Sequence, residues 1–166
     1  LPPDLWPVSM DVTQMNQAIS NLVLNAVQAM SQQGVVDIFA ENLFLPENSA
    51  LPLPAGPYVH IAIRDYGPGI RPDDLPHIFD PYFTTRPDGT GLGLSVAHSV
   101  VQRHGGHLTV ESIPNQGSTF HIYLPAVEPA PSTAAPPTER PATGHQHRIL
   151  VLDDDEALCI SLSLAL

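Results

Sequence analysis

Apolar side chains recur at three- and four-residue spacing in the first part of the chain, from Met15 to Met30. This is the repeat of a helix that buries one face. Asp11, with Gln14 three residues later, resembles a capping box and marks the start of the helix. Gly34 is a typical helix end. The pattern therefore predicts an amphipathic helix over residues 12–32.

Alternation of apolar and more polar positions predicts strands in four further segments. In residues 58–65, for example, Val59 and Ile61 alternate with their neighbours. A second helix is expected over 94–104, where Gly105 follows the apolar repeat. The expected strands are 35–41, 58–65, 107–113 and 118–124, with a proline-rich loop at 46–57 and a hairpin turn at 114–117.

The character of the chain changes after these elements. Residues 125–147 are rich in proline, alanine and threonine, which predicts an extended, semi-rigid linker. Residues 148–152 then form a short apolar run typical of a buried strand, and an acidic run follows at once. We therefore expect one domain over 1–127, a linker over 128–147 and the truncated start of a second domain over 148–166.

The charge balance argues against two classes of partner. The 166 residues include 17 acidic and 6 basic side chains, whereas nucleic-acid and anionic-membrane surfaces need a basic footprint. The single cysteine, Cys159, rules out an internal disulfide framework and fits a reducing compartment such as the cytoplasm. No apolar run approaches the ~20 residues that span a bilayer. Because the chain starts with Leu1 rather than Met, we expect a piece of a longer protein, with room for a membrane anchor upstream.

Asp65 ends the second predicted strand and is followed by Gly67 and Gly69. A carboxylate only accepts hydrogen bonds, so it would select a ligand with a donor, such as the amino group of adenine, and would repel the carbonyl of guanine. The glycines would let the chain turn tightly against a flat ring. A plain turn after a strand explains the same residues and stays open.

A glycine cluster leads into the second predicted helix, at Gly89, Gly91 and Gly93. The unpaired N–H groups and the positive dipole end of that helix would suit a polyphosphate. The chain has no lysine, so Arg86 is the cation nearest in sequence. A flexible helix entry and a solvated loop arginine are the simpler alternatives.

Two asparagines, Asn21 and Asn25, share one face of the first predicted helix, flanked by Gln14 and Gln28. An Asn carbonyl can be one of the few protein ligands of Mg²⁺, with water and phosphate oxygens as the others. A solvated polar helix face is the alternative.

Joined in this order, four segments resemble the N, G1, F and G2 boxes of the catalytic ATP-binding domain of sensor histidine kinases, in the gyrase/Hsp90/histidine kinase/MutL superfamily. The resemblance covers about residues 4–125. It implies a two-layer α/β sandwich of the Bergerat type, with ATP between helices and a mobile lid. The segments are Asn21-Leu-Val-Leu-Asn25-Ala26, Asp65-x-Gly67-x-Gly69, Phe79-Asp-Pro-Tyr-Phe-Thr-Thr-Arg86 and Gly89-Thr-Gly-Leu-Gly-Leu94.

The resemblance also implies roles for single residues. Asn25 would hold Mg²⁺, Asp65 would bind adenine, and Phe79 and Phe83 would pack the lid. Arg86 stands where the family often has Lys. The implied ATP-binding positions are Asn21, Asn25, Asp65, Gly67, Gly69, Phe79, Phe83, Thr85, Arg86, Gly89, Thr90, Gly91, Leu92, Gly93 and Leu94.

Asn21 separates two branches of the superfamily. Hydrolysing members place a Glu four residues before the metal-binding Asn, where it can activate water as a general base. An Asn cannot take the proton, so the resemblance implies transfer of the ATP γ-phosphate rather than hydrolysis. The implied cofactors are ATP and Mg²⁺. A nucleotide-binding regulatory module without transfer activity is the alternative.

None of the histidines is expected to accept the phosphate, so no catalytic residue is expected within this chain. In the family the acceptor lies on an upstream dimerisation domain, whose motif this sequence lacks. His98, His104 and His107 are expected to line or cap the second helix. The implied partners are that upstream domain and a response-regulator receiver, in the same or a separate chain, within a homodimer of the full-length protein.

Residues 148–166 resemble the opening of such a receiver domain. The first strand of a receiver ends in an acidic pair that binds Mg²⁺, which by position would be Asp153 and Asp154, with Asp155 as a helix cap. A solvated acidic turn is the alternative. The phosphoacceptor Asp and the Lys of that family would lie beyond Leu166.

Overall fold

The computed structural model describes residues 2, 4–31, 34–87, 89–127, 149–151 and 160–163. Helix α1 spans Val12–Ala29. Asp11 caps it as predicted, because its Oδ1 accepts the N–H of Gln14 at 3.0 Å and its Oδ2 accepts the Gln14 side-chain amide at 3.0 Å. The helix ends before the predicted residue 32, since Ser31 has φ 55° and leaves the right-handed helical region.

Four antiparallel strands form one sheet in the order β1-β2-β4-β3. Strand β1 begins two residues later than predicted and extends further, because it pairs with β2 from Asp37↔Arg64 to Leu45↔Gly56. The loop between them is correspondingly shorter than expected. The strands are β1 Asp37–Leu45, β2 Gly56–Arg64, β3 His107–Ile113 and β4 Gly117–Pro125.

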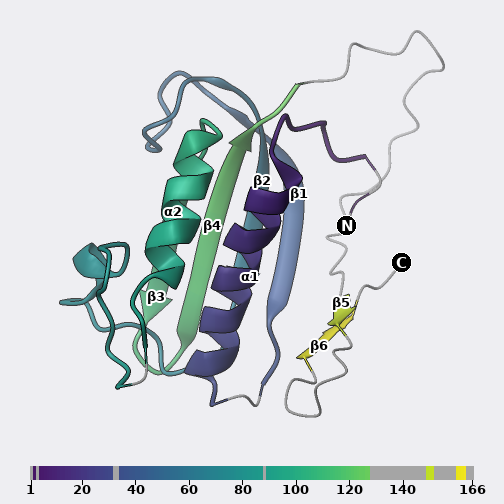
Figure 1. Cartoon of the computed structure of the whole chain (residues 1–166). Coiled ribbons are helices and arrows are strands. Elements are labelled where there is room, and N and C mark those ends of the chain that lie inside the picture. Colours follow the sequence, from purple (N-terminus) through teal and green to yellow (C-terminus); the bar gives the residue numbers. More distant parts are fainter. Residues whose placement is uncertain are drawn as a thin grey trace, which may run out of the picture.

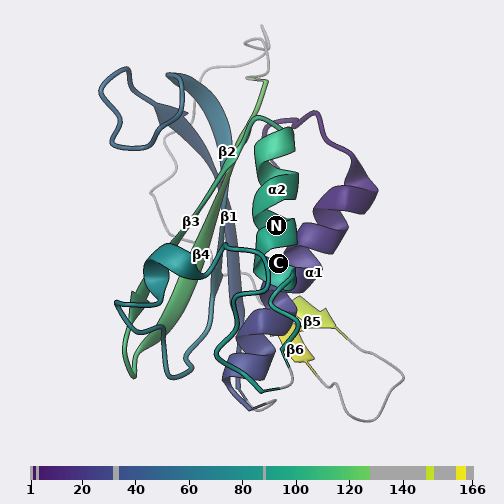
Figure 2. The ribbon, with the colours of Figure 1, turned by 60° about the vertical axis from the view of Figure 1, so that its left-hand side comes forward.

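Helix α2, Gly93–Arg103, lies beside α1 on one face of the sheet (Figure 1). Figure 2 shows the two layers edge on, with both helices on the same side. The core lies between the layers, where Leu22, Ala97 and Phe120 are completely buried. The apolar repeat of each helix thus packs against the apolar alternation of the strands, and the predicted two-layer α/β sandwich is confirmed.

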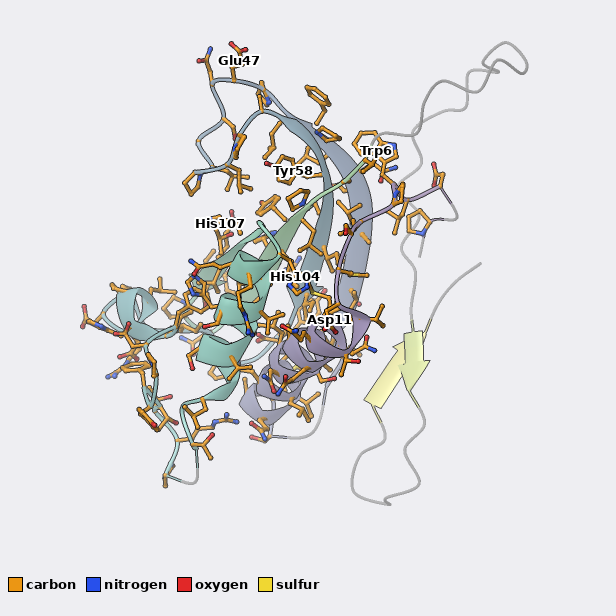
Figure 3. All side chains as sticks on the ribbon, turned by 45° about the horizontal axis from the view of Figure 1, so that its top comes forward. Trp6, Asp11, Glu47, Tyr58, His104 and His107 are labelled. Carbon is orange, nitrogen blue, oxygen red and sulfur yellow. The ribbon has the colours of Figure 1, made fainter. Side chains whose placement is uncertain are left out.

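The residues before α1 are held against the sheet and α2 by polar contacts. Asn42 of β1 accepts the N–H of Trp6 at 2.8 Å, and the N–H of Val127 donates to the carbonyl of Pro7 at 2.9 Å. The N–H of Asp11 donates to Nε2 of His104 at 3.0 Å (Figure 3). His104 is also the C-cap residue of α2, in agreement with its predicted capping role.

Two short strands follow the linker region. Strand β5, Ile149–Val151, lies within the predicted strand 148–152 and pairs antiparallel with β6, Ile160–Ser163. Asp153, Asp154, Asp155 and Cys159 lie outside the described residues, as does the linker 128–147. The receiver start therefore stays a prediction. None of the described helices is long and apolar enough to cross a membrane.

Candidate functional site

Asp65 lies directly after β2 and is one of the few buried polar residues, with 2% of its surface exposed. Its Oδ1 accepts the N–H of Gly67 at 2.9 Å and the N–H of Ser118 at 3.3 Å. Burial raises the pKa of the Asp65 carboxyl above its usual range, and these hydrogen bonds partly oppose that effect. Both described backbone hydrogen bonds to this carboxylate go to Oδ1, and the hydroxyl of Ser118 also acts on the carboxylate and lowers its pKa.

The turn after Asp65 packs closely against its surroundings and at Gly69 leaves no room for a side chain. A Cβ added to Gly67 would lie 3.0 Å from Oδ1 of Asp65 and 3.4 Å from the backbone of Ala29, at the end of α1. Gly69 has φ 69°, and a Cβ there would lie 2.9 Å from the carbonyl carbon of Ile113. The predicted tight turn is therefore present, and it rests on both α1 and the β3–β4 hairpin.

The β3–β4 hairpin supports this turn in a way that sequence reasoning missed. The N–H of Asn115 donates to the carbonyl of Pro68 at 2.7 Å, and the N–H of Ile70 donates to Oγ of Ser112 at 2.8 Å. The N–H of Asp65 donates to the carbonyl of Ser118 at 2.9 Å. The sequence identified residues 114–117 only as a hairpin turn, with no sign that they contact the site.

The polar face of α1 meets the beginning of α2. A Cβ added to Gly93 would lie 3.9 Å from Cβ and Cγ of Asn21. Asn21 and Asn25 are both half-buried on this face. The N-terminus of α2 has no side-chain cap, since the N-cap residue is Leu92, so among the described residues no side chain binds its first N–H groups. Two predicted motifs far apart in sequence thus come together.

Phe79 and Phe83 anchor the loop between β2 and α2. Both are partly buried against the core, which agrees with the predicted packing role. The ring of Phe79 stacks on His98 of α2, with centroids 4.9 Å apart. Burial lowers the pKa of His98 below its usual range, so the neutral ring is the favoured partner. His98 therefore lines α2 as expected. The short helix η1, Leu75–His77, precedes these two residues.

The glycine cluster forms a closed turn against the same loop. Tyr82 and Gly91 both have positive φ, 68° and 67°, and the N–H of Tyr82 donates to the carbonyl of Gly91 at 2.9 Å. A Cβ at Gly91 would lie 2.6 Å from Cα of Tyr82. A Cβ at Gly89 would lie 3.2 Å from Cβ of Thr84. The cluster is therefore a tightly packed turn rather than an unstructured helix entry.

Arg86 extends from this loop to α1, where its Nη1 donates to Oε1 of Gln28. The threonines of the same loop make fewer hydrogen bonds through their side chains. Thr85 is exposed without a described hydrogen bond, and Oγ1 of Thr90 accepts the N–H of Leu92 at 3.5 Å. Leu94 is partly buried in the core. From the sequence, Gln28 was expected only to flank the asparagine pair, and its hydrogen bond with Arg86 was not predicted.

Three segments thus converge on the C-terminal half of α1. Gly93 approaches Asn21, Arg86 binds Gln28, and Gly67 approaches Ala29. Gly93, Arg86 and Gly67 belong to the G2, F and G1 segments, and only the order of these segments along the chain could be read from the sequence. Within the described part of the chain, no three His, Cys, Asp or Glu side chains gather in a way that could hold a metal ion.

Comparison with known proteins agrees with this geometry. Residues 10–128 match the family described as histidine kinase-, DNA gyrase B- and HSP90-like ATPase. The chain is 42% identical to the sensor histidine kinase ZraS of Escherichia coli K12 over 118 residues, which cover 71% of this chain and 23% of ZraS. It is 34% identical to the sensor kinase CckA of Brucella abortus over an alignment of 168 positions, which covers 93% of this chain and 18% of CckA.

A solved structure shares the fold. Full-length ShkA, crystallised in complex with AMPPNP, superposes with a TM-score of 0.60 and 30% identity, over 76% of this chain and 25% of ShkA. The chain thus spans about a quarter or less of these three proteins. The match of residues 10–128, together with the two-layer sandwich and its converging segments, shows that the chain belongs to the histidine kinase-, DNA gyrase B- and HSP90-like ATPase family, with the fold of a sensor histidine kinase catalytic domain.

Proposed function

We propose that this chain binds Mg–ATP and presents the γ-phosphate to a histidine on a separate dimerisation domain of the same protein. The observation that carries the proposal is the convergence of Gly67, Arg86 and Gly93 on the C-terminal half of α1. In this arrangement Asp65 as an acceptor for the base, the cation of Arg86 and the N-terminus of α2 would all lie along the half of α1 that carries Asn21 and Asn25. Few ligands other than a nucleoside triphosphate need all of these groups together.

Adenine is the base that Asp65 would select. Its Oδ1 is occupied by two backbone N–H groups, so Oδ2 is left to accept a hydrogen bond from the exocyclic amino group of adenine. Guanine has a carbonyl at that position, and the carboxylate would repel it because both groups are acceptors with negative charge density. The absence of a Cβ at Gly67 and Gly69 lets the turn lie close to α1 and to the β3–β4 hairpin, and the base would stack against the backbone of this turn.

The phosphates would lie between α1 and the start of α2. The uncapped N–H groups of α2 and the guanidinium of Arg86 supply positive potential in a chain without lysine. Asn25 would give its side-chain oxygen to Mg²⁺, with phosphate and water oxygens as the other ligands. The bound ion would neutralise charge on the phosphates. Asn25 fits such an ion, because the oxygen of its side-chain amide is a hard ligand of the kind that Mg²⁺ prefers.

Phosphoryl transfer is favoured over hydrolysis by the identity of Asn21. A general base beside the γ-phosphate would activate water, but the amide of Asn21 cannot accept a proton. Positioning and charge neutralisation suffice for transfer once an acceptor is brought in line with the phosphate. ShkA in complex with AMPPNP is a related fold that binds an ATP analogue, which supports nucleotide binding by this chain.

The decisive experiment uses this chain and the full-length protein with γ-labelled ATP. The 166-residue chain should bind Mg–ATP, hydrolyse it barely above background and remain unlabelled. The full-length protein should become labelled, with the acid-labile, alkali-stable product expected of phosphohistidine. Binding without labelling of the full-length protein would instead indicate a regulatory module, and rapid hydrolysis by the chain alone would contradict the argument from Asn21.

We also infer that residues 148–166 begin a receiver domain and that the full-length protein is a homodimer. The alignment with CckA covers 93% of this chain, which takes it well beyond residue 128, and this supports a shared arrangement after the linker. Asp153 and Asp154 would then belong to the receiver Mg²⁺ site. If the longer reading frame lacked a parallel α/β domain after residue 148, this inference would fail while the kinase proposal stood.

A further inference from the structure

The hydroxyl of Ser112, on β3, is a junction of three hydrogen-bonding groups. It accepts the N–H of Ile70 at 2.8 Å and donates to the carbonyl of Gly117 at 3.1 Å. The hydroxyl of Ser118 lies 3.0 Å away. A serine hydroxyl has one donor and two acceptor positions, so these three groups use its full capacity. An alanine at this position would leave all three without this partner.

These groups connect the two parts of the base site. Ile70 ends the turn that begins at Gly67, whereas Ser118 holds the carboxylate of Asp65 through its own N–H. Ser112 pairs directly with Ser118 across the β3–β4 ladder. One hydroxyl therefore links the flat glycine turn to the strand residue that orients the carboxylate.

We propose that Ser112 is a positioning residue for the base of the nucleotide, holding the turn 67–70 and Asp65 at a fixed separation. The inference rests on the proposed function, since it assumes that the base lies against this turn. A second tie, from the N–H of Asn115 to the carbonyl of Pro68 at 2.7 Å, holds the middle of the turn but touches neither Asp65 nor Ser118. Oδ1 of Asp65 links the start of the turn, at Gly67, to Ser118, and Ser112 is the other described side chain that does so, at the far end of the turn, Ile70.

If the hydroxyl of Ser112 only stabilised the fold, a different experimental result would be expected. Loss of such a hydroxyl would lower the stability of the domain and would weaken the binding of all nucleotides equally. Loss of a positioning group would change the discrimination between bases. The distance from the turn to the carboxylate decides whether adenine can contact the turn and donate a hydrogen bond to Asp65 at the same time. The ratio of ATP to GTP affinity is therefore the informative measurement.

Titrations with ATP and GTP should compare the wild-type chain with three variants. Ser112→Ala should weaken ATP binding roughly tenfold, the effect of one lost hydrogen bond, with a much smaller change for GTP. Ser112→Thr keeps the hydroxyl and should retain the discrimination. Thr109→Ala removes a hydroxyl from the same strand that makes no described hydrogen bond, and should match the wild type. An unchanged ATP to GTP ratio in Ser112→Ala would overturn the inference and leave the proposed function intact.

Amide hydrogen exchange tests the tie without any nucleotide. The N–H of Ile70 should be protected in the wild-type chain and should exchange at least about tenfold faster in Ser112→Ala, since its acceptor is gone. Rapid exchange of this amide in the wild-type chain would overturn the inference even if Ser112→Ala failed to fold. If the tie is present but no nucleotide binds to the wild type, the proposed function fails and the positioning role fails with it.

Discussion

Asp65 and Ser118 hydrogen-bond each other in both directions. The N–H of Asp65 donates to the carbonyl of Ser118 at 2.9 Å, and the N–H of Ser118 donates to the side-chain Oδ1 of Asp65 at 3.3 Å. The backbone of the strand end and the carboxylate are thus fixed by the same residue of β4. These hydrogen bonds restrict rotation of the carboxyl group, so Oδ2 keeps a fixed orientation.

Replacement of Asp65 by Asn should separate recognition from stability. The Asn Oδ1 can still accept both backbone N–H groups, but the other atom becomes a donor that faces the amino group of adenine. We expect ATP binding to weaken by roughly 1–3 kcal/mol, the usual cost of a mispaired polar group. Because burial raises the pKa of Asp65 in the fold, its charge lowers stability at neutral pH, so the free energy of unfolding should be unchanged or higher in Asp65→Asn.

Calorimetric titration and chemical denaturation of the same Asp65→Asn sample measure the two effects. Undiminished ATP affinity would remove Asp65 from the base site. A large loss of stability would mean instead that the charge of Asp65 has a structural role.

Removal of the Asn25 side chain should affect nucleotide binding only through the metal. Asn25→Ala should weaken Mg–ATP binding about tenfold or more and metal-free ATP binding little, because only the first complex loses a ligand. Asn16→Ala, an exposed position on the same helix, is the matched control. Titrations with Mg²⁺ and with a chelator compare the two states, and equal effects in both would make Asn25 an ordinary helix residue.

Substitution of Gly117 should destabilise the domain by direct collision. Gly117 has φ 96°, and an added Cβ would lie 2.9 Å from the carbonyl carbon of Asp65. Gly56 also has positive φ, 150°, but nothing lies within 4 Å of an added Cβ. Gly117→Ala should therefore lower the free energy of unfolding by about 1–3 kcal/mol more than Gly56→Ala. Equal losses in urea denaturation would show that backbone conformation alone, and not contact, sets the cost.

A histidine pair on the outer face of the sheet should make stability depend on pH. Nδ1 of His121 lies 3.0 Å from Nε2 of His60, whose Nδ1 contacts Glu41 at 2.9 Å. Nε2 of His121 is buried without a described hydrogen-bond partner, 3.8 Å from Glu111. Burial lowers the pKa of His121, the neighbouring His60 lowers it further, and Glu111 opposes the shift.

The sign of this effect follows from the lowered pKa. The unfolded chain takes up a proton near pH 6.5, while folded His121 resists it, so the stabilisation is complete above about pH 6.5 and is lost as the pH falls through the folded pKa. His98 and His107, whose pKa values burial also lowers, act in the same direction. His121→Gln should therefore reduce the slope of unfolding free energy between about pH 7 and pH 5.

His77→Gln is the matched control for this slope, since it removes an exposed imidazole from η1. Denaturation curves at several pH values provide the comparison. Parallel pH profiles for the wild type and His121→Gln would contradict the assignment.

The local elements and the main motifs could be predicted from the amino-acid sequence. The helical repeat from Met15 to Met30 and the alternation in 58–65 each depend on a few neighbouring residues, and a buried face must show such a period. Both elements were predicted to within three residues at their ends. Helix ends and strand lengths were less certain, because Ser31 and the pairing partners of β1 decide them.

The contacts that support the site, in contrast, depend on the three-dimensional arrangement of distant segments. The tie between Ile70 and Ser112 spans 42 residues of sequence, the tie between Asp65 and Ser118 spans 53, and that between Arg86 and Gln28 spans 58. Such contacts depend on strand register and on how the layers pack, and a single serine or glutamine has no periodic signature. The motifs could therefore be predicted from sequence, whereas the residues that hold them in place become visible only when distant segments meet in the fold.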